Sequence, residues 1–169
     1  DGTVDNVDDR VFSEGSTTDN NPLFNLGTQN GGEDGRFDFY FRDDGSPNHQ
    51  YSVAEPFDNT WHHIAWVDAG HVGTMYVDGV EDETFDYGSF VSATFAPDTT
   101  TIGGILRGSD CCNFTGGIDD VALYNVALSA GDITRLASGV SPLEVPEPSS
   151  LVLAILGLMG LCGLSRRRA

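Results

Sequence analysis

The order of apolar and polar residues along this chain predicts short β-strands joined by tight turns. In residues 36–42, three phenylalanines alternate with Asp38 and Tyr40, so the phenylalanines share one face of a strand. Asp78 and Gly79 separate two further apolar runs, a pair that is typical of a β-hairpin. The pattern therefore favours antiparallel β-sheets.

The predicted strands span residues 10–13, 23–26, 36–42, 61–67, 74–77, 80–85, 100–104 and 117–124. Because residues 61–67 are apolar on both faces, that strand is expected inside a sandwich. Residues 129–138 are predicted to form a helix that begins with Ser129 as its N-cap. The expected fold is all-β, an antiparallel two-sheet jelly-roll sandwich.

The charge balance of the chain excludes nucleic acid as a partner. The chain has 26 acidic and 8 basic residues, and every basic residue is an arginine. Before Pro146 there are 25 acidic residues and five arginines, which gives a formal charge of −20. Such a surface repels nucleic acid and anionic membranes. Calcium is the expected counter-ion, because carboxylates and carbonyls are the ligands that it prefers.

The C-terminal end contains three parts in a fixed order. The first is a Pro-Glu-Pro triplet at Pro146, Glu147 and Pro148. An uncharged apolar stretch follows from Leu151 to Leu164, and a basic stop comes last, at Arg166, Arg167 and Arg168. At about 1.5 Å per residue the apolar stretch spans roughly 21 Å, short of the roughly 30 Å hydrocarbon core. It is predicted to be a marginal transmembrane helix with its arginines on the cytoplasmic side. The alternative is a helix docked on the domain's own core.

These three parts resemble the PEP-CTERM sorting signal of bacterial surface proteins. The resemblance implies processing near the Pro-Glu-Pro triplet by an exosortase, a membrane-embedded cysteine protease. It also implies export, with a transient inner-membrane anchor before delivery to the cell surface or extracellular matrix. The expected organisation is a domain over residues 1–140, a linker over 141–150 and a sorting helix with a basic tail over 151–169.

A second resemblance covers most of the domain. Residues 61–67, 75–79, 101–104 and 114–129 resemble a LamG-like domain of the concanavalin A-like lectin/glucanase type. In that family one or two strands precede the equivalent of Arg10, and an exported protein needs an N-terminal leader. The chain, which starts at Asp1, is therefore expected to be a fragment whose N-terminal strands and signal are missing.

The family resemblance implies a calcium site at Asp119. Members often combine an aspartate of the last strand with backbone carbonyls of the opening strand to hold structural calcium. The other ligands would then lie in the missing part. The alternative is that Asp119 and its neighbour Asp120 are ordinary carboxylates of a strand or turn.

Catalytic residues are not expected. His62 and His63 are neighbours in a predicted strand, so their side chains point to opposite faces and cannot chelate one ion together. Glu81 and Glu83 alternate as the paired carboxylates of a glycosidase do, but they follow a hairpin turn and lack the rest of a catalytic strand. We therefore expect a protein that is not an enzyme.

Aromatic side chains in a concave sheet bind sugars by stacking, although core packing would explain the same residues. The available ones are Tyr40, Tyr51, Trp66, Tyr76 and Tyr87. The expected function is carbohydrate or protein binding, with extracellular polysaccharide or a surface protein as the partner. The alternatives are a glycan hydrolase and a purely structural matrix component.

Cys111 and Cys112 are adjacent, and the third cysteine, Cys162, lies in the apolar tail. An exported location permits disulfides. A bridge between neighbours closes a strained eight-membered ring. The predicted disulfide joins Cys111 and Cys112. The alternatives are unpaired thiols, or a bond to the missing N-terminal part or to another chain.

Overall fold

A computed structural model describes residues 8–18, 20–31, 34–43, 46–91 and 96–145. The elements follow in chain order as β1 (Arg10–Gly15), β2 (Leu23–Thr28), β3 (Phe37–Asp43), β4 (Ser46–Tyr51), β5 (Ile64–Asp68), β6 (Val72–Val77), β7 (Val80–Asp86), η1 (Gly88–Phe90), β8 (Thr99–Ile102), β9 (Ile105–Arg107), β10 (Ser109–Cys111), α1 (Ala130–Ala137) and η2 (Pro142–Glu144).

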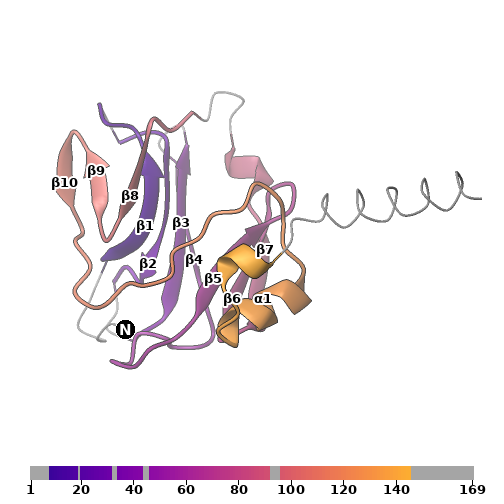
Figure 1. Ribbon diagram of the computed structural model, residues 1–169. Helices are drawn as coiled ribbons and strands as arrows, with labels where there is room; N and C mark the ends of the chain where they lie inside the picture. Colours follow the sequence, from indigo (N-terminus) through magenta and orange to yellow (C-terminus); the bar gives the residue numbers. More distant parts are fainter. Residues whose placement is uncertain (1–7, 19, 32–33, 44–45, 92–95, 146–169) are drawn as a thin grey trace, which may run out of the picture.

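The strands form two main antiparallel sheets and one small hairpin (Figure 1). Sheet A has five strands in the order β4-β3-β2-β1-β8, and sheet B has three in the order β5-β6-β7. The β9–β10 hairpin lies beside β1 and β8 (Figure 1). The prediction of an antiparallel, mostly β domain is confirmed.

The main core lies between the two sheets and contains the phenylalanine face of β3. Phe37, Phe39 and Phe41 are all buried there, as their alternation predicted, and Met75 of β6 packs against them. The Trp66 ring stacks on Phe39 with 3.8 Å between ring centroids. These aromatic contacts hold sheet B against sheet A.

A second apolar cluster lies under α1, on the far side of sheet B. It contains Tyr76, Leu128, Ile133 and Val145, all of them buried. The predicted cap is confirmed, because the Ser129 side chain accepts a hydrogen bond from the Asp132 amide. Residues 141–145, which the sequence assigned to a linker, therefore pack on the domain through the buried Val145.

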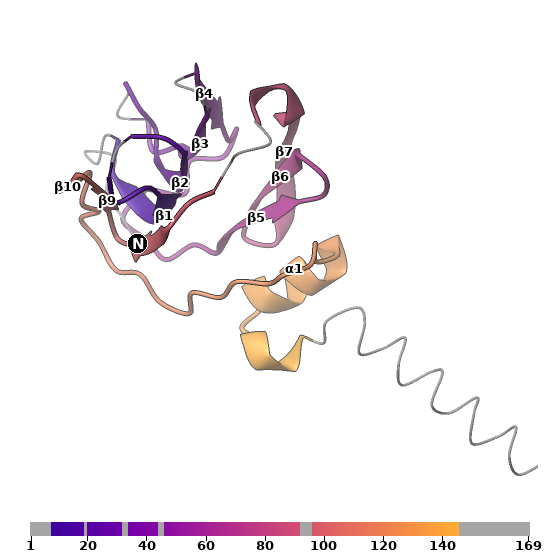
Figure 2. The same cartoon turned by 90° about the horizontal axis from the view of Figure 1, so that it is seen from above.

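The prediction of a strand over residues 117–124 is wrong. That segment runs along the outside of the molecule toward α1 without joining a sheet (Figure 2). The strand predicted over 61–67 is shorter, because β5 begins at Ile64 and Trp61 is 61% exposed. Strands β4, β9 and β10 lack an alternating apolar pattern and were not predicted.

Within the described ranges, the helices are too short and too polar to cross a membrane. The predicted transmembrane helix, the Pro-Glu-Pro triplet and the basic stop all fall in residues 146–169, outside the described residues. The helix predicted for this segment therefore remains a prediction.

Candidate ligand-binding face

Sheet A has an outer face, which we define as the side opposite the phenylalanines of β3. The strand register places its residues in two rows that cross four strands. The first row is Arg10, Gly27, Asp38 and Tyr51, and the second is Ser13, Asn25, Tyr40 and His49. Charged, amide and aromatic groups therefore meet on one surface.

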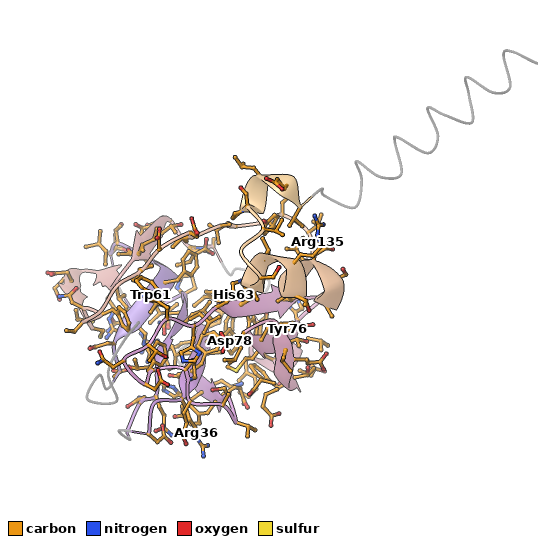
Figure 3. The ribbon with its side chains drawn as sticks, turned by 60° about the horizontal axis from the view of Figure 1, so that its bottom comes forward. Arg36, Trp61, His63, Tyr76, Asp78 and Arg135 are labelled. Carbon is orange, nitrogen blue, oxygen red and sulfur yellow. The ribbon has the colours of Figure 1, made fainter. Side chains whose placement is uncertain are left out.

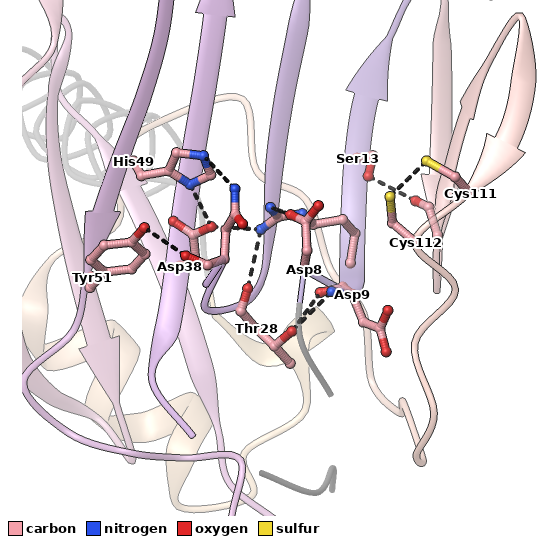
Figure 4. Close-up of polar contacts among 12 residues, drawn as sticks. Asp8, Asp9, Ser13, Thr28, Asp38, His49, Tyr51, Cys111 and Cys112 are labelled. Atoms are coloured by element: carbon pink, nitrogen blue, oxygen red, sulfur yellow. Dashed lines mark hydrogen bonds and ion pairs between the residues drawn. The ribbon is translucent and has the colours of Figure 1, made fainter. Parts of the chain in front are cut away.

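An ion pair lies at the centre of the first row. Arg10 Nη1 is 2.8 Å from Asp38 Oδ2, and the two residues are 2% and 0% exposed. Arg10 also contacts the Asp8 carboxylate and donates to the carbonyl of Thr28 (Figure 4). Two carboxylates and a carbonyl thus compensate the buried guanidinium.

Gly27 gives Arg10 the space to reach Asp38. A β-carbon at Gly27 would lie 2.9 Å from Cδ of Arg10 and 2.1 Å from the Asp9 carbonyl oxygen. A larger residue would therefore push the Arg10 side chain off the sheet. Burial, together with the nearby Asp8 carboxylate, raises the pKa of Asp9.

Aromatic rings continue the outer face at β4. The ring of His49 lies 4.4 Å from that of Tyr40 and 5.9 Å from that of Tyr51, with which it is nearly parallel. His49 Nδ1 is 2.9 Å from Asp38 Oδ2, so the ion pair orients the imidazole (Figure 4). His49 is 22% exposed, and its neighbour Tyr51 is half-buried. Ligands can therefore reach this edge of the sheet.

Several buried polar atoms on this face lack a hydrogen-bond partner within the described part of the chain. Both amide atoms of Asn25, which is fully buried, are among them, as are Arg10 Nε and Asp38 Oδ1. Such atoms are uncommon in protein interiors, because each one costs free energy when it leaves water.

The hydroxyls of the two tyrosines on this face are held in the neutral form. Burial raises the pKa of Tyr40, against the opposing effect of Arg42 and the other nearby arginines. Burial, with the charge of Asp38 next, also raises the pKa of Tyr51. Both hydroxyls therefore remain protonated and able to donate a hydrogen bond at neutral pH.

The β9–β10 hairpin covers the part of the outer face that surrounds Leu23 and Tyr40. Ile105 packs against Leu23 and Tyr40, and Cys111 and Cys112 line the same cluster. Two further contacts fix the hairpin to β1. The Arg10 amide donates to the carbonyl of Cys112 at 2.8 Å, and the Ser13 hydroxyl donates to the carbonyl of Gly104 at 2.8 Å.

Residues 3–134 match the concanavalin A-like lectin/glucanases superfamily. The chain belongs to this superfamily. Residues 144–168 match the PEP-CTERM protein-sorting motif, so this lectin/glucanase domain carries a signal for exosortase processing, export and cell-surface sorting. The comparison with curated proteins gave no match.

A solved structure with some likeness is an S-layer domain-containing protein (residues 221–444) from Clostridium thermocellum. It is 21% identical over 69% of this chain, with a TM-score of 0.35. The chain spans 57% of that protein's resolved length.

The structure places most of the candidate aromatic residues of this lectin/glucanase domain in its core. Tyr76 and Tyr87 are buried, and Trp66 stacks between the sheets. The Tyr87 hydroxyl donates to Asp68 at 2.6 Å, and burial raises the pKa of Tyr87. Core packing therefore explains these three. On the outer face, Tyr40 is buried beneath the β9–β10 hairpin, and Tyr51 is half-buried.

Asp119 lies exposed in the segment that follows β10, where its side chain accepts the amide of Asp120 at 2.9 Å. In the part of the chain that the structure describes, no group of three or more His, Cys, Asp or Glu residues is placed to hold a metal ion. Calcium binding by Asp119 stays a prediction.

Glu81 and Glu83 are both exposed on β7, an edge strand of sheet B.

The neighbouring residues His62 and His63 have pKa values that are shifted in opposite directions. His62 Nδ1 lies 2.7 Å from Asp78 Oδ2, and this hydrogen bond raises the pKa of His62 against the effect of burial. His63 and Asp78 lie together in Figure 3, and burial lowers the pKa of His63.

A cleft of about 1230 Å³ runs along β5 between the two sheets. Ile64 and Trp66 form one wall, and residues 117–128 form the other. The lining also includes Phe24 and Leu26, whose side chains belong to the edge of the main core. The lining is mostly apolar by area and also includes His62, His63, Asp68 and Asp78.

Tyr40 and Tyr51 were predicted from the sequence as candidate binding residues, but Arg10, Asn25, Asp38 and His49 were not. Two signals pointed to them. Asp38 alternates with phenylalanines in a strand, and Gly27 lies inside a strand where a larger residue would be expected. Neither signal shows which residues become neighbours, because that depends on the register between strands.

Proposed function

We propose that this protein is an exported, non-enzymatic module that binds carbohydrate at the cell surface or in the extracellular matrix, through the outer face of sheet A. The observation that carries the proposal is the pair of partly exposed aromatic rings, His49 and Tyr51, beside the Arg10–Asp38 ion pair.

The chemistry of this face suits a sugar. A sugar ring has C–H groups that pack against an aromatic face, and hydroxyls that need donors and acceptors at its edge. The rings of His49 and Tyr51 supply the flat apolar surface. The carboxylate of Asp38 lies 2.9 Å from the imidazole and is fully buried, so it orients His49 and does not itself meet a ligand. The polar groups next to the stacking surface are the imidazole of His49 and the hydroxyl of Tyr51.

The charge of the domain narrows the class of sugar. With −20 before Pro146, the domain repels polyanions at long range. Neutral polysaccharide is therefore the expected ligand. Export to a surface where extracellular polysaccharide accumulates agrees with the sorting motif.

A glycan array probed with the full-length protein in detergent tests the proposal. We expect binding to a defined class of neutral glycans. A uniformly dark array would contradict carbohydrate binding and favour a structural matrix component. Repeating the array with a chelator tests the calcium prediction separately.

A hydrolase would bind and then degrade its glycan. The released reducing ends, measured over time on any glycan bound by the array, distinguish the two functions. We expect none to be released. If sugar is released and the substitutions Glu81→Gln and Glu83→Gln stop it, the protein is an enzyme and the proposal fails.

A further inference from the structure

The cysteine pair at the end of β10 is held in an unusual way. Neighbouring side chains in a regular strand point to opposite faces, which keeps their sulfur atoms apart. Here β10 ends at Cys111, and Cys112 has a positive φ of 58°. This turn brings the two sulfur atoms to 2.6 Å, within the cluster formed by Leu23, Tyr40 and Ile105.

We propose that Cys111 and Cys112 form a disulfide bond in the exported protein, and that this bond fixes the β9–β10 hairpin to the start of β1 on the outer face of sheet A. Cys111 and Cys112 are the two cysteines in the described part of the chain, and their sulfur atoms are in contact with each other. The sorting motif sends the domain out of the cytoplasm, into compartments where disulfides persist.

The surroundings assign different roles to the two sulfur atoms. Arg107 Nη2 lies 3.5 Å from Cys111 Sγ. Burial, followed by the contact with Cys111, raises the pKa of Cys112 to about 12. Cys111 is therefore the attacking sulfur, and Cys112 completes the bond.

The reaction needs a disulfide as oxidant. The Cys111 thiolate attacks one sulfur of the oxidant, and the other sulfur leaves as a thiolate. Cys112 then loses its proton and attacks Cys111 in the mixed disulfide, which releases the second thiolate of the oxidant. The cysteine pair loses two electrons and two protons, and the oxidant becomes two thiols.

The bond would act on the ligand-binding face through β1. The carbonyl of Cys112 accepts the Arg10 amide at 2.8 Å, and Asn113 forms an isolated bridge with Arg10. A closed ring at Cys111 and Cys112 limits the conformations open to this loop. Cα atoms of neighbouring residues are about 3.8 Å apart, closer than in most disulfides, so we expect the bond to be easily reduced.

Mass spectrometry of the full-length Cys162→Ser protein tests bond formation. The reduced protein is incubated with oxidised glutathione and digested with trypsin without reductant. Cleavage after Arg107 and Arg135 gives a peptide that contains both cysteines, and we expect it to be two hydrogens lighter. Cys112→Ser in the same background should instead stop at the adduct with one glutathione. Free thiols in that peptide, or peptides cross-linked between chains, would overturn the proposal.

Hydrogen exchange at the Arg10 amide tests whether the disulfide fixes the β9–β10 hairpin to β1. Oxidation should slow its exchange at least several-fold, and dithiothreitol should reverse the change. The Cys111→Ser, Cys112→Ser double variant should show no response to either reagent. If the bond forms and the exchange rate of the Arg10 amide stays the same, the proposed link to β1 is wrong.

Discussion

Arg10 and Asp38 form an ion pair across an intervening strand, with Arg10 Nη1 2.8 Å from Asp38 Oδ2 although β2 lies between β1 and β3. The contact is possible because Gly27 of β2 leaves the Arg10 side chain room to cross. His49 then joins the pair from β4. Side chains of β1, β3 and β4 are thereby connected on the face that we assign to ligand binding, across the glycine of β2.

Gly27→Ala should destabilise the protein by about 2–3 kcal/mol, because the added carbon overlaps the Asp9 carbonyl and the Arg10 side chain. The matched control is Gly131→Ala in α1, where the nearest atom lies 3.7 Å from the added carbon. That variant should retain stability or gain up to about 1 kcal/mol. Urea unfolding of both variants measures the difference, and equal effects would contradict the packing described for Gly27.

Asp38→Asn should cost about 3 kcal/mol, because it removes the charge that compensates the buried Arg10. Asp34→Asn is the control, since Asp34 pairs with the half-exposed Arg36 at 3.1 Å. Partly exposed pairs of this kind contribute about 0–1 kcal/mol. Thermal and urea unfolding check both values. A loss below about 1 kcal/mol for Asp38→Asn would show that the ion pair does not organise sheet A.

The His62–Asp78 hydrogen bond should make stability depend on pH. Its effect raises the folded-state pKa of His62 above the ordinary value of about 6.5. The resulting stabilisation is complete below about pH 6.5 and is lost as pH rises through the folded-state pKa. Asp78→Asn keeps an oxygen acceptor but removes the charge, so the wild-type protein should lose its advantage over this variant as pH rises.

Urea midpoints of the two proteins from about pH 5.5 to about pH 8 measure that advantage. Burial lowers the pKa of His63 and the Asp78 charge opposes that effect, so Asp78→Asn lowers the pKa of both histidines and the difference between the two proteins measures their joint response to the Asp78 charge. An advantage that stays constant across the range would rule out the assigned role of the His62–Asp78 bond.

Local patterns in the sequence predicted much of the fold. The phenylalanine face of β3, the hairpin at Asp78 and Gly79 and the cap of α1 at Ser129 are all confirmed. Each depends on residues close together in the chain, where alternation or capping alone decides the structure.

The strand that was wrongly predicted and the ion pair that was not predicted have a different cause. Residues 117–124 have a strand-like composition, but a strand also needs a hydrogen-bonded partner strand, and in the described structure this segment joins neither sheet. The Arg10–Asp38 pair joins residues 28 positions apart. Their contact follows from the register of three strands, which alternation does not determine.

The central claim is that the outer face of sheet A binds glycan, and affinity measurements on two aromatic variants test it most directly. The full-length protein, Tyr51→Ala and Trp61→Ala are titrated with a glycan selected on the array. Tyr51→Ala should bind about tenfold more weakly, because it removes part of the stacking surface. Trp61→Ala, which removes an aromatic ring that is 61% exposed away from this face, should bind like the wild type. Unchanged affinity for Tyr51→Ala, or loss of binding for Trp61→Ala, would contradict the account.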